Sequence, residues 1–139
     1  MTIRSPTIVS IGNAITDVIS FSDDEFLIRN GMKKSAMNLI DSKRSEEIDD
    51  LIDESSIVAG GSAANTAACF SKFNCSSKFI GRVGKDKYGL SYAKNLAEQN
   101  VETNLINDPN FSTARSYIFV TPDKNRTMNT YLGASKNLQ

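Results

Sequence analysis

The chain has 139 residues, of which sixteen are basic and sixteen acidic, so its formal charge is zero. With 40% apolar and 23% charged residues, it has the composition of one ordinary globular domain. No basic stripe interleaved with aromatic residues is visible. The composition therefore argues against binding to nucleic acid and favours small molecules or proteins as partners.

No apolar run approaches the roughly 20 residues of a membrane span, and residues 1–6 lack the apolar core of a signal peptide. We therefore expect no membrane association and a cytoplasmic location. Cys69 and Cys75 are the only cysteines and there is no histidine, so we expect no metal site. Cys69 should be a buried thiol on a helix and Cys75 an ordinary loop thiol.

The first apolar run, residues 7–11, ends at Gly12-Asn13 and predicts a strand of a parallel sheet that is buried on both faces. Asp17 follows just beyond the carboxyl end of this strand. Because open α/β sheets bind ligands there, its carboxylate is a candidate acceptor for substrate hydroxyl groups. A plain loop or capping aspartate is an equally open interpretation.

Residues 18–40 mix short apolar runs with polar turns and an Asn-Gly pair. This pattern predicts small strands or a brief helix in a subsidiary sheet that would make a natural lid. From Ser42 the apolar spacing becomes helical, and Ile48, Leu51 and Ile52 should share the inner face. We expect the charged residues of this helix, Asp49 among them, to be a solvated face.

Two adjacent glycines, Gly60 and Gly61, lead into an alanine-rich run that favours a helix. Glycine permits a positive φ and lets a ligand approach the backbone closely. We expect Ser62 to be the N-cap of this helix, whose free N–H groups and dipole would receive a hydroxyl group or an anion. Asn65 in the first turn either holds a ligand hydroxyl through its amide or caps the turn locally.

Two helices follow the glycine pair, separated by a predicted strand at residues 78–84. In each helix apolar residues recur at helical spacing and should pack on the sheet. They are Ala63, Ala67, Phe70 and Phe73 in the first helix, and Leu90, Ala93, Leu96 and Ala97 in the second. The alternation of strand and helix predicts a parallel sheet with right-handed crossovers. The nearby glycines do not make a dinucleotide fingerprint, which argues against a Rossmann-type oxidoreductase.

In the last third, residues 113–120 and 126–132 read as a hairpin around a turn. Arg126 emerges beside its tip, where its guanidinium would meet a phosphate or simply be exposed. Residues 133–139 show no further helix or strand.

Four blocks of sequence, in this order and at these distances, carry a family resemblance. They are Gly12-Asn13 with Asp17, the stretch Ala-Gly-Gly-Ser-Ala-Ala-Asn at 59–65, the glycine-containing stretch 81–89, and residues 126–134. From Ile8 to Ser135 the chain resembles the N-terminal part of the PfkB/ribokinase family of carbohydrate and nucleoside kinases. It is most similar to the adenosine-kinase-like branch.

The resemblance implies a fold and an activity. The fold is a ribokinase-like three-layer α/β/α sandwich, with a Rossmann-like parallel sheet and a small β-lid formed by roughly residues 18–40 and 113–132. Residues 1–139 would be the N-terminal part of a single kinase domain. The activity is transfer of the γ-phosphate of ATP, with Mg²⁺, to a primary hydroxyl of a sugar or of a ribonucleoside such as adenosine.

The resemblance also assigns site residues. Asp17 would hold the ribose hydroxyls, beside the backbone N–H of Gly61 and the amide of Asn65, while Asn13 would help to shape the sugar site. The other expected substrate-binding positions are Gly60 and Ser62 of the glycine turn, the apolar lid residues Ile15, Met37 and Leu39, and Arg126 near the transferred phosphate or the lid closure.

One departure from the family pattern matters. The Gly-Ala-Gly-Asp motif, which in the family forms the anion hole and supplies the catalytic base, does not occur in these 139 residues. Phosphoryl transfer depends on such groups, so we predict a substrate-binding half with no catalytic residue and no turnover alone. The alternative is a non-catalytic sugar- or nucleoside-binding module, or a subunit that needs a separate C-terminal chain. A homodimer through the lid is a further expectation.

Overall fold

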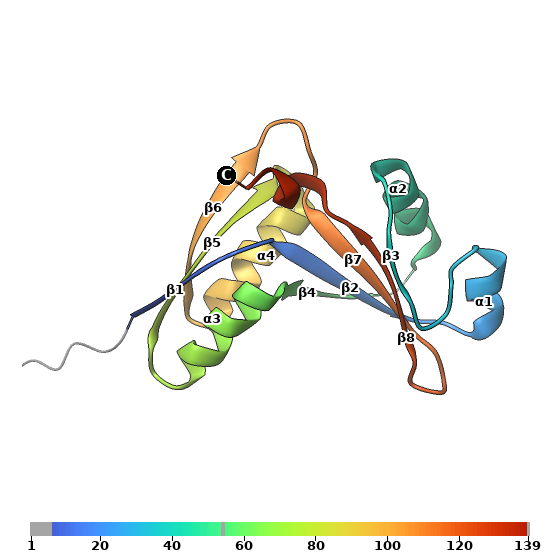
Figure 1. The fold of residues 1–139 in the computed structure, drawn as a ribbon, viewed down its shortest axis with the longest axis horizontal. Helices are drawn as coiled ribbons and strands as arrows, with labels where there is room; N and C mark the ends of the chain where they lie inside the picture. The colour runs from blue at the N-terminus through green and yellow to red at the C-terminus, as the bar shows by residue number, and fades with distance from the viewer. Residues whose placement is uncertain (1–6, 54, 139) are drawn as a thin grey trace, which may run out of the picture.

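The computed structural model describes residues 7–53 and 55–138, which form two sheets side by side (Figure 1). The expectation for residues 1–6 lies outside the described residues. The strands are β1 (Thr7–Ile11), β2 (Ile15–Phe21), β3 (Met37–Leu39), β4 (Ser56–Gly60), β5 (Ser76–Gly84), β6 (Val101–Asp108), β7 (Ala114–Val120) and β8 (Arg126–Tyr131). The helices are α1 (Asp24–Arg29), α2 (Ser42–Leu51), α3 (Ser62–Lys72), α4 (Lys87–Glu98) and the short 3₁₀ helix η1 (Gly133–Asn137).

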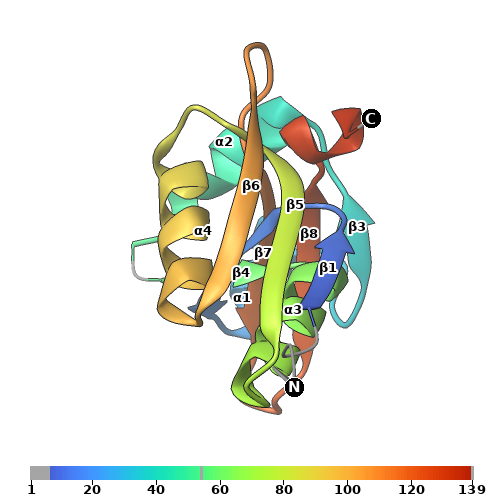
Figure 2. The same ribbon diagram turned by 90° about the vertical axis from the view of Figure 1, so that its left-hand side faces the viewer.

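The first sheet, with strand order β1-β5-β6, is entirely parallel, as expected. Helices α3 and α4 lie on the same side of it, behind the strands in Figure 2. Phe79 and Val83 of β5 pack there against the alanines of α3 and against Tyr92 and Leu96 of α4. We call these three strands and two helices the body.

The prediction that β1 is buried on both faces is wrong. Its residues alternate between half-buried and exposed, and the side chain of Ile11 is 63% exposed. The physical reason is that β1 is an edge strand of a sheet that the described helices cover on one face only. Val9 and Ile11 project from the opposite face.

The second sheet, with strand order β3-β8-β7-β2-β4, is the lid. The predicted hairpin is confirmed, since β7 and β8 pair antiparallel. The lid sheet is larger than the predicted segments, because it begins at Ile15 and includes β4. Helices α1 and α2 cover one face, where Leu27 and Ile48 pack against Val18, Tyr117 and Phe119. The other face is turned toward α3 (Figure 1).

The helices lie in the predicted segments but are rotated relative to the prediction. In α3 the buried residues are Ala64, Ala67 and Ala68, whereas Phe70 is exposed and Phe73 is 72% exposed. Alanines lie against the sheet because the contact is tight: a Cβ at Gly12 would come within 2.8 Å of the Cβ of Ala63.

The rotation of α3 also affects the solvent exposure of the two cysteine side chains, Cys69 and Cys75. Cys69 is exposed, so its predicted burial is wrong, and Cys75 is half-buried. The physical reason is that Cys69 follows the two buried alanines Ala67 and Ala68 on the helix and so turns away from the sheet.

In α4 the predicted inner residue Leu96 is buried, but Leu90 is 76% exposed and Ala97 is exposed. The inner face is completed instead by Tyr88 and Tyr92. Tyr92 packs in the apolar cluster of the body and Tyr88 in that of the lid, so the two rings lie where the two parts meet.

Candidate functional site

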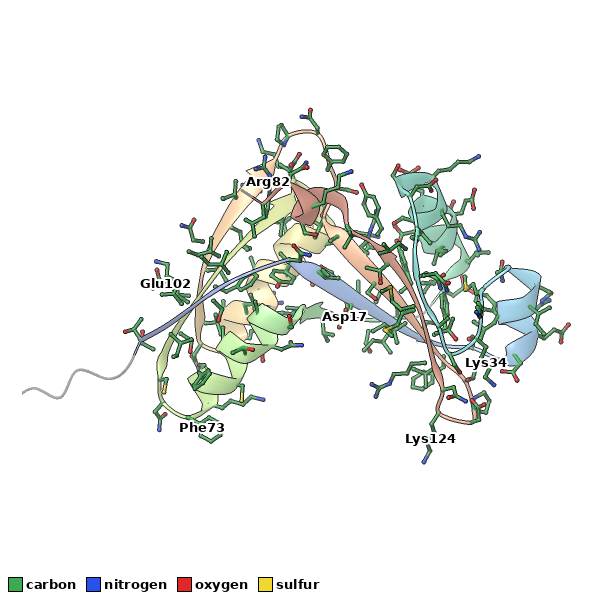
Figure 3. All side chains as sticks on the ribbon, viewed as in Figure 1. Asp17, Lys34, Phe73, Arg82, Glu102 and Lys124 are labelled. Carbon is green, nitrogen blue, oxygen red and sulfur yellow. The ribbon has the colours of Figure 1, made fainter. Side chains whose placement is uncertain are left out.

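Asp17 lies in the middle of β2 rather than beyond the end of a strand, because only Gly12, Asn13 and Ala14 separate β1 from β2. The chain thus passes directly from the body sheet into the lid sheet. Figure 3 labels Asp17 between α3 and the lid strands, at the opening between the two parts of the molecule. This position keeps Asp17 a candidate ligand-binding residue.

Asp17 belongs to a row of side chains that crosses the lid sheet. It pairs with Ser116 of β7, which pairs with Thr130 of β8, which pairs with Leu39 of β3. Directly paired residues project from the same face of a sheet, so all four side chains share the face opposite α1 and α2. The hydroxyls of Ser116 and Thr130 are 3.0 Å apart and hydrogen-bonded to each other.

A second row on the same face is apolar. It contains Ile19 of β2, Ile118 of β7, Met128 of β8 and Met37 of β3. Residues two apart on a strand share a face, so this row lies beside the first one. We call the two rows, with Val58 of β4, the open lid face: one carboxylate and two hydroxyls surrounded by apolar side chains.

The carboxylate of Asp17 is half-buried and packs tightly against the backbone of Gly60. A Cβ at position 60 would lie 2.5 Å from the carboxyl carbon of Asp17, so this approach requires glycine. Burial raises the pKa of Asp17 to about 6, and no hydrogen bond from the described residues counteracts this rise. A partly desolvated carboxylate without a donor is well suited to accept hydrogen bonds from a ligand.

Gly61 turns the chain from β4 into α3 with a φ of 92°. A Cβ at this position would also collide with the backbone carbonyl of Asn13, so the turn requires glycine twice over. The prediction that Ser62 is the N-cap is wrong: Gly61 occupies that position, without a side-chain hydrogen bond, and Ser62 is the first helical residue. The positive φ of Gly61 is the physical reason.

The first turn of α3 opens toward the same region. The first helical bond runs from the N–H of Asn65 to the carbonyl of Gly61, at 2.9 Å. The three N–H groups before Asn65 therefore precede the helical ladder. The side chains of Asn13 and Asn65 are exposed, and that of Asn65 does not make the predicted local cap.

Tyr92 is a site residue that the sequence analysis missed. Its hydroxyl donates a 3.0 Å hydrogen bond to the carbonyl of Gly60, which holds the glycine turn against α4. Burial, and then the negative charge of Asp17, raise the pKa of Tyr92, so it stays a donor. The sequence analysis assigned Tyr92 no role, because the predicted inner face of this helix did not include it.

Arg126 is not brought to Asp17. It is exposed at the outer end of β8, where it pairs with Val120. Thr130, the residue in the row of Asp17, lies four positions further along β8, which corresponds to about 13 Å along the strand. Asp17 does not line the pockets around Phe119, Asp86 and Tyr131, although Leu39 and Thr130 of its row line the last of these.

Two further expectations from the sequence concerned metal sites and membrane spans. Within residues 7–53 and 55–138, no three Cys, Asp or Glu side chains are grouped so that they could hold a metal ion. In the same part of the chain, no helix has the length and apolar character needed to cross a membrane.

Comparison with known proteins gives a consistent result. A model of the pfkB family of carbohydrate kinases matches residues 5–139. The crystal structure of a probable sugar kinase from Rhizobium etli is 40% identical, with a TM-score of 0.83 over 97% of this chain. Adenosine kinase from Sinorhizobium meliloti is 39% identical, with a TM-score of 0.80 over 96% of this chain.

Among the curated relatives, adenosine kinase 2 of Arabidopsis thaliana is 25% identical over 111 residues. The chain spans 41% of each of the two bacterial kinases and 32% of the Arabidopsis protein. These similarities confirm the ribokinase-like α/β fold and the expectation that the chain corresponds to an N-terminal portion.

Proposed function

The chain belongs to the pfkB family of carbohydrate kinases, and from this membership we propose that it is the substrate-binding portion of an ATP-dependent sugar or nucleoside kinase. The acceptor would be a primary hydroxyl of a ribonucleoside such as adenosine, or of a sugar. The printed names of the relatives include both classes, an adenosine kinase and a sugar kinase.

The observation that carries the proposal is the carboxylate of Asp17, half-buried on the open lid face without a hydrogen-bond donor. At neutral pH it is mostly ionised, because its pKa of about 6 lies below 7. Two vicinal ribose hydroxyls would donate to its two oxygens and offset its lost hydration. The N–H groups at the start of α3, with the amides of Asn13 and Asn65, would bind the remaining sugar oxygens.

The apolar residues of the open lid face support a nucleoside over a free sugar. Met37 and Leu39 at one edge, with Ile15 and Ile19 on β2, would cover a flat apolar group such as a purine. A hexose carries a hydroxyl or hydroxymethyl group on every ring carbon and would gain less from these side chains. We therefore propose an adenosine-like ribonucleoside as the preferred acceptor.

Ser62 and Arg126 have weaker places in the proposal. Ser62 is exposed at the start of α3, where its hydroxyl would reach a sugar oxygen only at the rim of the site. Arg126 would approach a bound phosphate only after a movement of the hairpin, since it lies about 13 Å along β8 from the row of Asp17.

We also propose that the chain by itself does not catalyse phosphoryl transfer. The sequence has no Gly-Ala-Gly-Asp motif to serve as anion hole and base. ATP and Mg²⁺ therefore enter the proposal only as requirements of the family. The competing proposal, a binding module or a subunit completed by another chain, uses the same surface. An assay of ADP release with adenosine should give no rate above the blank.

Calorimetric titration with adenosine, ribose and fructose tests the binding proposal. Adenosine should bind most tightly, and Asp17→Ala should weaken its binding at least tenfold. Asp50→Ala is the matched control, because Asp50 is an exposed aspartate on α2 away from the open lid face. Equal affinity in the Asp17 and Asp50 variants would remove Asp17 as the hydroxyl anchor. Absence of binding by the wild type would refute the proposed function.

Two expectations from the sequence stay predictions. A homodimer through the lid would bury exposed Phe21 and Met37, and light scattering of the purified chain would detect it. The cytoplasmic location likewise awaits a direct measurement.

A further inference from the structure

We propose that Arg115 is a positioning residue: with Asp49 and Tyr88 it clamps the lid sheet to the body and so sets the place of Asp17 relative to the glycine turn. Neither the family resemblance nor the comparisons give these residues a role. The proposal rests on the proposed function for its effect on ligand binding, but the clamp itself can be tested without a ligand.

Arg115 stands directly behind the candidate site. It pairs with Thr16 in the ladder between β2 and β7, so it lies next to Asp17 along the sheet but projects from the opposite face. Ser116, the following residue, is the partner of Asp17 in the row on the open lid face. A displacement of Arg115 therefore moves the backbone that carries this row.

The contacts of Arg115 join four elements. Its Nη1 donates to Oδ2 of Asp49 on α2 at 2.7 Å, in an ion pair with side-chain exposures of 7% and 23%. Its guanidinium carbon lies 4.8 Å from the ring centre of Tyr88 on α4 and 5.5 Å from that of Tyr131 on β8. One buried cation on β7 thus touches the helix that covers the lid, a helix of the body and the neighbouring lid strand β8.

Asp49 completes the connection from its own side. Its Oδ1 accepts hydrogen bonds from the hydroxyl of Tyr88 at 2.6 Å and from that of Tyr117 at 2.9 Å. The prediction that Asp49 belongs to a solvated face is therefore wrong. The helical pattern concealed its role because Tyr88 and Tyr117 lie far away in the sequence.

A second tie reinforces the same junction. Asp86, the N-cap of α4, accepts hydrogen bonds from the N–H and the hydroxyl of Thr113, both at 2.7 Å. Thr113 immediately precedes β7, the strand that carries Arg115. The start of β7 is thus attached to the start of α4 through Asp86, and a few residues later through the aspartate and tyrosine that hold Arg115.

The network is better suited to fix an orientation than to maximise stability. The Nε atom of Arg115 is buried and has no partner in the described structure. A buried ion pair also loses hydration on both charges, and apolar residues of similar size often stabilise a protein as well or better. What an arginine adds is direction, because its planar fork bonds and stacks in a defined geometry. The apolar cluster around Ile48 and Phe119 already holds α2 on the lid.

The test combines a charge-free replacement with a distance measurement. The variant Asp49→Leu/Arg115→Met leaves no charge unpaired, and Arg115→Met alone is its single-site companion. Spin labels at Lys43 on α2 and Lys94 on α4, both exposed, report the lid relative to the body, in a background of Cys69→Ser and Cys75→Ser. The matched control is Glu102→Leu/Lys78→Met, which removes an exposed ion pair within the body sheet.

We expect the double variant to keep the urea midpoint of the parent while the width of its distance distribution at least doubles. Its dissociation constant for adenosine should rise at least tenfold, and the control should change neither quantity. A folded double variant with the parental distribution would overturn the proposal, as would an equal broadening in the control. Failure of both Arg115 variants to fold would also overturn it, since the network would then serve stability.

The outcome separates the clamp from the proposed function. If the parent chain does not bind adenosine, the proposed function fails, whereas the distance distributions still decide whether Arg115 and Asp49 orient the lid.

Discussion

Asp17 and Leu39 occupy the same cross-strand row of the lid sheet, connected through the hydrogen-bonded hydroxyls of Ser116 and Thr130. Leu39 is 66% exposed and lies three strands away from Asp17, about 14 Å at the usual strand spacing, so only a ligand long enough to span this distance can donate to Asp17 and cover the leucine. The row therefore joins a polar anchor to an apolar edge on one surface. The predictions below test the parts of this surface separately.

Leu39→Ala should weaken the binding of adenosine about five- to tenfold, while the weak binding of ribose should change little. The reason is that an exposed leucine can bury apolar area only against the base, at about 25 cal/mol per Å². Calorimetry with both ligands measures the difference. Leu90→Ala, which removes an equally exposed leucine from α4, is the control and should alter neither affinity. An equal loss for ribose would contradict the assignment of Leu39 to the base.

Gly60→Ala should abolish measurable adenosine binding and cost about 1–3 kcal/mol of unfolding free energy. The added Cβ would lie 2.5 Å from the carboxyl group of Asp17 and would force that side chain out of place. Gly31→Ala is an informative comparison, because Gly31 has a φ of 64° with no atom within 4 Å of an added Cβ. It should lose stability through backbone strain but keep its affinity. Unaltered binding by the Gly60 variant would argue against this packing.

The stability of the free chain should depend on the ionisation of Asp17. Its pKa is raised by burial from 3.8 to about 6 in the folded state, so the folded state binds more protons than the unfolded state between these values. Stability contributed by this group therefore falls as the pH rises through that window. The loss is at most about 3 kcal/mol, since one pKa unit corresponds to about 1.4 kcal/mol, and partial exposure lowers it.

Asp17→Asn should consequently be more stable than the wild type above pH 6 and similar to it below pH 4. Urea unfolding of both proteins at several pH values measures this difference. The same variant should bind adenosine more weakly, because an amide offers one acceptor oxygen instead of two. A constant stability difference across the whole pH range would show that the carboxylate is not desolvated as described.

Ile11→Lys should reduce self-association of the chain without lowering its melting temperature. Ile11 lies on an edge strand, is 63% exposed, and shares an apolar face of the body sheet with Val9. Exposed edges of this kind promote pairing between chains, and a lysine opposes it. Light scattering over a range of concentrations measures the effect. Phe73→Lys, at the C-cap of α3, is similarly exposed but away from the edge and should change association much less.

Local patterns identified many of the elements, because apolar periodicity and turn residues act over a few positions. The body strands β1 and β5, the hairpin of β7 and β8, and helices α2 to α4 lie where these patterns predicted them. The sequence also predicted that a helix begins directly after Gly60 and Gly61. The comparisons confirmed the family resemblance, because the family model matches residues 5–139.

The rotation of each helix could not be obtained from those patterns. Phe73 and Leu90 have the spacing of inner residues, yet they are exposed, because small alanines in α3 and two tyrosines in α4 fit the space beside the sheet better. The prediction that β1 is buried on both faces was wrong for a related reason. An apolar sequence shows that a strand can be buried, but only the tertiary structure determines whether another element covers each of its faces.

By itself the sequence determined the hairpin of the lid, the longer helices, the glycines at the turn into α3 and the presence of a carboxylate at Asp17, since each depends on short-range chemistry. The tertiary structure alone decided that Leu39 stands in the row of Asp17 and that Arg115 meets Asp49, which is 66 residues away in the chain. These relationships depend on strand register and on the packing of distant segments. Local sequence patterns do not encode either one.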